Sequence, residues 1–277
     1  MEYVADDELL VELPGGLALE DGRCLRAAVL RPLTGRAEDW LARHRGAPSA
    51  LAVTRVLGLC LARLDELPGG PELARRLLVG DREFLMLRLR ERTLGATIQA
   101  VFSCPACAAK MDVDLRADAV QVEPRPQTAA SFSLELGQPG AERSVRFRLP
   151  TGADQEAALG AGAGAAEALF TRCLLDDGGA PLSDDEREAV IGAMEALAPQ
   201  LDLELELACP ECGDGFVTPF DTTAFFLSEL RGGGRQLLAE VHHLALHYHW
   251  SEAEILGLTR ERRRAYLALL GEALRRE

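Results

Sequence analysis

The chain has 277 residues, of which 48% are hydrophobic, enough to bury the core of one large or two modest domains. Its formal net charge of −14 repels phosphate backbones and weighs against a nucleic-acid partner. No stretch approaches the roughly 20 apolar residues of a membrane span, and the start MEYVADDELL lacks signal-peptide features. We therefore expect a cytoplasmic protein without a membrane partner.

Residues 1–95 are expected to form a small N-terminal sheet followed by helices. Two strand-like runs, DELLVEL and CLRAAVLRPL, are separated by the turn signals PGG and EDG. From residue 37 to residue 94 the hydrophobic spacing is helical and fits three or four helices. One of them is SALAVTRVLGLCLARLDEL, for which Ser49 is the expected N-cap.

Four of the seven cysteines form two CxxC pairs, Cys104 with Cys107 and Cys209 with Cys212. The segments TIQAVFS and MDVDL flank the first pair, LDLELELA and FVTPFD flank the second, and all four are strand-like. Two such hairpins facing each other place four thiolates around one Zn²⁺, as in a zinc ribbon. The sequence therefore predicts a structural zinc ion held by these four cysteines.

The two turns differ in one residue that bears on their conformation. Gly213 follows the second pair and tolerates a positive φ, whereas Ala108 occupies the matching place after the first pair. We expect the first turn to be the less regular one.

The distance between the pairs leaves alternatives to a shared metal ion. Residues 108–208 separate them. Closing a loop of that length costs on the order of 4 kcal/mol, whereas structural zinc binding supplies roughly 10–16 kcal/mol, so the metal offsets the closure. The alternatives are two separate turns without metal, or a redox pair, which would require a helix after the CxxC where strands are expected. The isolated Cys24, Cys60 and Cys173 are expected to be small buried hydrophobic residues.

Residues 96–220 are interpreted as a zinc-ribbon body that contains an insertion at residues 121–200. A polar linker, VEPRPQTAA, precedes a hairpin whose strands SFSLELG and SVRFRLP are joined by QPGAER. Three helical segments follow, and Ser183 with Glu186 forms a capping box at the start of the last one. The run GAGAGA matches a dinucleotide fingerprint only nominally, because a helical segment rather than a strand precedes it.

Residues 221–277 are predicted to form a C-terminal helical module. TTAFFLSEL is interrupted at residues 232–234, after which RQLLAEVHHLALHYHW carries an apolar stripe. Ser251 and Glu254 form another capping box, and TRERRRAYLALLGEAL closes the chain. The basic run RERRR, at residues 260–264, is interpreted as a solvated helix start, the alternative being a grip on phosphate.

A histidine cluster lies on the same module, at His242, His243, His247 and His249. His243 and His247 have the i, i+4 spacing of a metal site, but Leu244 stands where a HExxH motif requires glutamate. We interpret the cluster as a solvated or partner-facing edge and leave its role open.

Four blocks in this order resemble a known family. They are FSCPAC, SVRFRLPTGADQEAAL, LELACPECGDGFVTPFDTTAFFLSEL and LLAEVHHLALHYHWSEAEILGLTRERRRAYLALL. Together, from Ile98 to Leu270, they are similar to the T-even-type phage baseplate hub assembly chaperones, a family that also occurs in phage-tail-like contractile injection systems.

The resemblance implies a non-enzymatic protein that helps to assemble the baseplate hub or wedge, whether or not it stays in the particle. It also implies that the same four cysteines are the zinc ligands. The glycines at 232–234 depart from the pattern, which has a continuous helix there.

These observations give an α+β fold: a zinc-ribbon-like pair of CxxC hairpins with a long inserted region, an N-terminal sheet with helices, and a C-terminal helical module. The expected function is that of a baseplate assembly chaperone or adaptor, with baseplate or hub proteins as partners and no small-molecule substrate. One alternative is a nucleic-acid-binding zinc-ribbon protein, for which a basic face is required. A zinc enzyme that uses the histidines is a further alternative, but four cysteines leave no open metal position.

Overall fold

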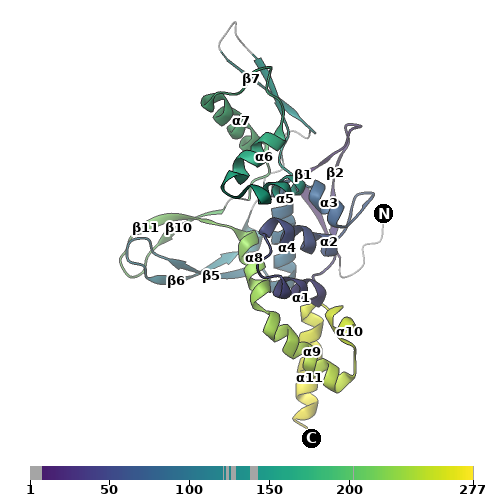
Figure 1. The fold of residues 1–277 in the computed structure, drawn as a ribbon. Helices are drawn as coiled ribbons and strands as arrows, with labels where there is room; N and C mark the ends of the chain where they lie inside the picture. Colours follow the sequence, from purple (N-terminus) through teal and green to yellow (C-terminus); the bar gives the residue numbers. More distant parts are fainter. Residues whose placement is uncertain are drawn as a thin grey trace.

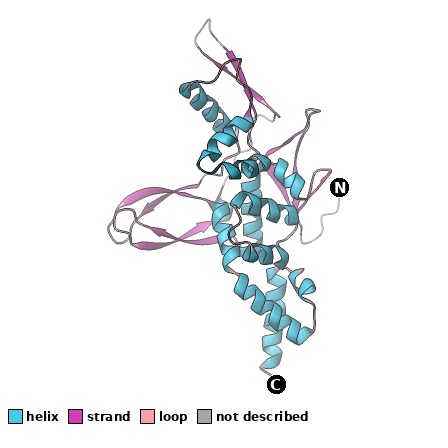
Figure 2. Ribbon diagram, viewed as in Figure 1, coloured by secondary structure: helices cyan, strands magenta, loops and turns pink. Residues whose placement is uncertain are grey.

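The computed structural model describes residues 8–120, 122, 125, 129–137, 143–201 and 203–276. It is an α+β structure, as predicted: a central body of helices and a small sheet, from which three parts project (Figure 1). One projection is a lobe that carries β7 and α7, the second is an arm made of strands, and the third consists of α9, α10 and α11. Figure 2 shows that the arm is built of strands and loops, whereas helices dominate the central body and the C-terminal projection.

The N-terminal sheet has four antiparallel strands in the order β1-β2-β3-β4. They are β1 (Leu9–Ala18), β2 (Cys24–Leu30), β3 (Leu61–Leu64) and β4 (Leu67–Pro68). The expectation that LARL continues the preceding helix is wrong, because the helix ends at Cys60 and the chain turns back beside β2. Asp65, in the turn between β3 and β4, holds β3 beside β2, since its carboxylate accepts hydrogen bonds from the backbone N–H groups of Arg26 and Ala27.

The PGG segment is a bulge inside β1 rather than the predicted turn between strands. The pairing of β1 with β2 shifts register between Glu12 and Leu17. The carboxylate of Asp81, which is fully buried in α4, accepts hydrogen bonds from the N–H groups of Gly15 and Gly16 at 2.7 and 2.9 Å. Burial raises the pKa of Asp81 to about 6. A residue about 65 positions away in sequence therefore holds the bulge in place.

Helices pack against this sheet and enclose the main hydrophobic core. They are α1 (Gly35–Arg43), α2 (Ser49–Cys60), α3 (Pro71–Arg76), α4 (Val79–Leu94) and, from much later in the chain, α8 (Thr222–Gly232). The first four match the predicted number. Ser49 is the first residue of α2 rather than its N-cap; Pro48 precedes it and no side chain caps the helix. Phe226, Leu227 and Leu230 of α8 belong to the same buried cluster as Leu85 and Leu89 of α4.

The lobe has its own hydrophobic cluster between a three-stranded sheet and its helices. Its elements are β7 (Phe132–Leu136), β8 (Arg143–Phe147), α5 (Gly152–Ala158), a 3₁₀ segment (Leu159–Gly164), α6 (Ala165–Cys173), β9 (Leu174–Asp176) and α7 (Asp184–Leu197). The predicted capping box of Ser183 and Glu186 opens α7. GAGAGA lies mostly in the 3₁₀ segment, in keeping with a structural connection. Most of the predicted linker VEPRPQTAA and of the QPGAER connection lies outside the described residues.

The C-terminal module consists of α9 (Gly234–Tyr248), α10 (Glu252–Leu256) and α11 (Arg260–Leu274). Gly233 separates α8 from α9, so the predicted interruption is present. The capping box of Ser251 and Glu254 opens α10, also as predicted.

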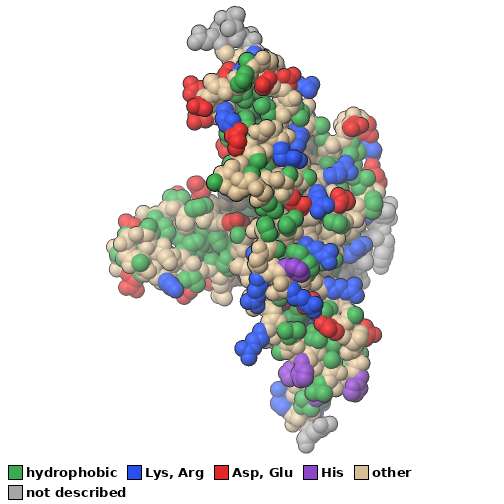
Figure 3. All heavy atoms as spheres, in the orientation of Figure 1, with side chains coloured by type: hydrophobic (Ala, Val, Ile, Leu, Met, Phe, Trp, Pro, Cys, Tyr) green, Lys and Arg blue, Asp and Glu red, His purple; other side chains and the backbone are tan. Residues whose placement is uncertain are grey.

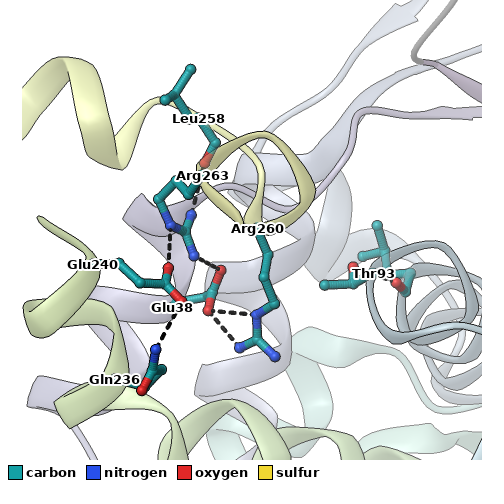
Figure 4. A network of polar contacts seen from close by, with 8 residues as sticks. Glu38, Thr93, Gln236, Glu240, Leu258, Arg260 and Arg263 are labelled. Atoms are coloured by element: carbon teal, nitrogen blue, oxygen red, sulfur yellow. Dashed lines mark hydrogen bonds and ion pairs between the residues drawn. The ribbon is translucent and has the colours of Figure 1, made fainter. Parts of the chain in front are cut away.

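A buried group of charges attaches this module to the central body (Figure 4). The guanidinium of Arg263 donates to Glu38 of α1 at 2.9 Å and to Glu240 of α9 at 2.8 Å, while Arg260 donates to the other oxygen of Glu38 at 2.5 Å. Arg263, Glu38 and Glu240 are 0%, 3% and 4% exposed. The interpretation of RERRR as a solvated helix start is therefore wrong for Arg263, whose charge is neutralised by carboxylates from two other helices.

None of the helices in the described residues combines the length and apolar character that a bilayer crossing requires. The division of the chain into domains at residues 95 and 220 stays a prediction.

Candidate metal centre

The arm consists of two β-hairpins from distant parts of the chain. The first pairs β5 (Thr97–Ser103) with β6 (Lys110–Arg116), and the second pairs β10 (Leu203–Ala208) with β11 (Gly215–Phe220). Both are antiparallel, and each connection contains one CxxC pair. Both predicted hairpins are thus present, and they lie side by side in the projecting arm (Figure 1).

Alternating side chains explain why the two hairpins pack against each other. Along β5, Ile98 and Ala100 are buried whereas Gln99 and Val101 are exposed, which is the period-two pattern of a strand with one covered face. Inward side chains of both hairpins form shared clusters, and the rings of Phe102 and Phe220 lie 5.8 Å apart. Phe220 in turn packs on Phe225 of α8, which fixes the base of the arm to the central body.

The two CxxC turns have the same backbone hydrogen bonds. The N–H of Cys104 donates to the carbonyl of Ala109, and the N–H of Ala108 donates to the carbonyl of Cys104, both at 2.9 Å. The second turn repeats this pattern with Cys209, Asp214 and Gly213 at 2.8 and 2.9 Å.

The expectation of a less regular first turn is therefore wrong. Ala108 adopts φ +58°, close to the +77° of Gly213, so it accepts the left-handed conformation that glycine takes more readily.

The four sulfur atoms meet at the tip of the arm. All four Sγ atoms lie within 4.8 Å of one another. The Sγ atoms of Cys104 and Cys212 are 3.7 Å apart, and those of Cys107 and Cys209 are 3.6 Å apart. A tetrahedral zinc ion with bonds of about 2.3 Å requires sulfur atoms about 3.8 Å apart. The spacing fits such an ion and is far longer than the roughly 2.05 Å of a disulfide.

One cysteine of each pair is buried and the other is exposed. Cys104 and Cys209 are each 2% exposed and pack beside Met111, while Cys107 and Cys212 face solvent. Both halves of the cluster thus contribute one thiol from the interior of the arm and one from its surface.

The thiols influence one another's ionisation. The backbone N–H of Cys212 is the largest of several hydrogen bonds that lower the pKa of Cys209 to about 7. At Cys212 the N–H of Asp214 lowers the pKa, but the thiols of Cys107 and Cys209 outweigh it and raise the pKa to about 12. Ionisation of a second thiol beside the first thiolate is therefore disfavoured unless a cation neutralises the negative charge. A bound divalent metal ion would supply that positive charge.

The remaining candidate residues do not join this cluster. His242, His243 and His247 are exposed on α9, and His249 ends that helix with φ +58°. Among the described residues, the four cysteines are the one group of three or more side chains placed to share a metal ion.

The isolated cysteines are placed largely as expected. Cys60 and Cys173 are buried, and burial raises their pKa values to about 12 and 11. Cys24 is only partly buried.

Apolar side chains that are not among the predicted site residues enclose the thiols. Met111 is buried beside Cys104 and Cys209, and Phe102, Leu207 and Phe216 pack around them. The strand alternation on either side of each CxxC pair is the signal that identifies them, because it places these residues on the covered face of the arm.

One comparison with known proteins gave a match. The family model of the T4 bacteriophage base plate protein matches residues 29–175, more than half of the chain. The matched residues include the first CxxC pair and end before the second pair. No curated protein and no solved structure matched the chain.

Proposed function

Because the chain belongs to the family of the T4 bacteriophage base plate protein, we propose that it is a non-enzymatic assembly chaperone or adaptor for the baseplate hub. The particle is a contractile phage tail or a phage-tail-like injection system, and the protein acts in the cytoplasm while that particle is assembled. A structural zinc ion held by Cys104, Cys107, Cys209 and Cys212 stabilises it.

The observation that carries this proposal is the meeting of four thiols, drawn from two distant CxxC pairs, at the tip of one arm. Four sulfur ligands suit zinc and fill its tetrahedral coordination, which leaves no position for a substrate or a reactive water. Such a site stabilises a fold rather than catalysing a reaction. Here it would join two hairpins that share only a narrow apolar interior.

The shape of the molecule supports an adaptor. Three parts project from one central body, so the protein offers several separate surfaces to large partners (Figure 1). Baseplate and hub subunits are the partners that family membership favours.

The surface of the arm disfavours the nucleic-acid alternative. The outer faces of the hairpins carry Asp112 and Asp114 on β6 and Glu204 and Glu206 on β10, all exposed. Lys110 and Arg116 are exposed on the same face of β6, but carboxylates outnumber them there, so the arm lacks the predominantly basic face of a zinc ribbon that binds nucleic acid.

The test is co-purification of the tagged full-length chain with hub and wedge subunits encoded beside it. The wild-type chain is expected to retain at least one of them. C209S should lose zinc and reduce this retention, whereas C173S, which alters a buried cysteine outside the cluster, should keep both. Failure of every hub and wedge subunit to co-purify with a folded, zinc-loaded chain would contradict the proposal.

A further inference from the structure

The solvent face of α7, in the lobe, is an acidic stripe. Asp184, Glu188, Ile191 and Glu195 are spaced so that they share one side of this helix, opposite the buried Val190. All four are exposed, Ile191 by 37%. The basic residue of α7, Arg187, lies off this stripe, where it forms an ion pair with Glu167 and covers the ring of Phe170.

The solvent face of α9, in the C-terminal module, has the opposite character. Arg235, Leu238, His242 and Leu246 share the side of α9 that faces away from the buried Leu237 and Leu244. Leu238 and Leu246 are each 59% exposed. The single carboxylate of α9, Glu240, is buried against Arg263, so this face carries no negative charge.

Within the described residues, neither stripe has an ion-pair partner: Arg235 on α9 and Asp184, Glu188 and Glu195 on α7 form no salt bridge. The two helices lie at opposite ends of the molecule (Figure 1), so they cannot meet within one chain. In Figure 3 acidic side chains gather along one side of the lobe and arginine and histidine side chains lie over the C-terminal helices, each with a few side chains of the opposite charge nearby.

We infer that α9 of one copy docks on α7 of a second copy. When the helices run antiparallel, Arg235 and His242 are seven residues apart on α9, the same separation as Glu195 and Glu188 on α7, and Leu238 and Ile191 lie between them, one residue out of step. Arg235 then faces Glu195, the imidazole of His242 donates to Glu188, and the offset side chains of Leu238 and Ile191 pack beside each other between these two pairs. Cation meets carboxylate and apolar side chain meets apolar side chain along one line of contact.

Charge decides between this arrangement and a symmetric pair. A two-fold contact through α9 would bring Arg235 and His242 against their own copies, and one through α7 would oppose carboxylates. The α9 to α7 contact is heterologous, so each copy keeps one unused surface and the chain of contacts either closes into a ring or continues. This inference concerns contacts between copies and does not depend on the zinc ion or on the proposed hub partners.

The test is sedimentation velocity of the zinc-loaded full-length chain over a range of concentrations at low and high salt. Wild type should associate as concentration rises, and salt should weaken the association because exposed charges are screened. R235E and, separately, E195R should each weaken association about tenfold, since each replaces an attraction by a repulsion.

Mixing R235E with E195R should restore association, because each protein then offers a complementary surface to the other. The control is R146E, which makes the same charge change as R235E on an exposed residue of β8. It should associate like wild type. A monomeric wild type at all concentrations, a mixture that does not associate, or a loss in R146E equal to that in R235E would each overturn the inference.

Discussion

Replacing Arg263 with alanine should release the C-terminal helices from the central body. The guanidinium donates to Glu38, to Glu240 and, at 2.9 Å, to the carbonyl of Leu258. Its removal leaves two buried carboxylates with Arg260 as the remaining cation. Breaking such a buried ion pair costs about 3–5 kcal/mol, because an uncompensated charge stays in the interior.

The fluorescence of Trp250 reports on this region, since its ring packs on Tyr248 and Tyr266 at 5.0 and 4.8 Å. The W40F substitution removes the other tryptophan, so fluorescence then reports on Trp250 alone. In this background, the urea concentration at the midpoint of the Trp250 fluorescence transition should be lower for R263A than for the chain that keeps Arg263.

The matched control is R264A, one position further along α11, where the side chain is exposed. It should change stability by less than about 0.5 kcal/mol. If R263A and R264A unfold at the same urea concentration, the buried charges do not hold the module and the reasoning is wrong.

Three further predictions concern other parts of the chain. A108G should stabilise the arm by about 1 kcal/mol, because glycine relieves the left-handed strain, and the melting temperature of the zinc-loaded chain checks it. Hydrogen bonds from Arg148 help to hold the pKa of the buried Asp154 carboxyl below its ordinary value. The ionised carboxylate therefore stabilises the folded state near pH 7, and this stabilisation is lost as acid protonates the carboxylate. D154N should therefore lose roughly 2–3 kcal/mol at pH 7, and the difference from wild type should shrink towards pH 3 in urea titrations. Iodoacetamide at pH 7.5 should leave Cys60 and Cys173 unmodified in the native protein, because burial raises both pKa values, and peptide mass spectrometry would reveal any labelling.

The arm could be predicted from sequence because its signals are local and mutually consistent. Alternating side chains define each strand, and a CxxC pair marks each turn. No local pattern shows that the two pairs meet, because about 100 residues separate them. That inference rests on the four thiolate ligands that a structural zinc ion requires. The left-handed conformation of Ala108 could not be predicted, because alanine by itself disfavours a positive φ. The first turn adopts it because its cysteines meet those of the second turn.

The errors have a common physical origin in contacts between distant residues. Leu61 and Leu64 have spacing that fits a helix as well as a short strand, and β2 beside them selects the strand. PGG is a turn signal in isolation, but Asp81 holds it as a bulge. The charge of Arg263 predicts an exposed side chain. Two glutamates from other helices neutralise this charge, so the side chain is buried instead.

The most direct test of the central claim is the metal content of the purified full-length chain, measured by elemental analysis for wild type and C209S. One zinc ion per chain in wild type, lost in C209S together with a lower melting temperature, is the predicted result, because the free energy of metal binding contributes to folding. A wild-type chain without stoichiometric metal, or a C209S chain that keeps both its zinc and its melting temperature, would contradict the account.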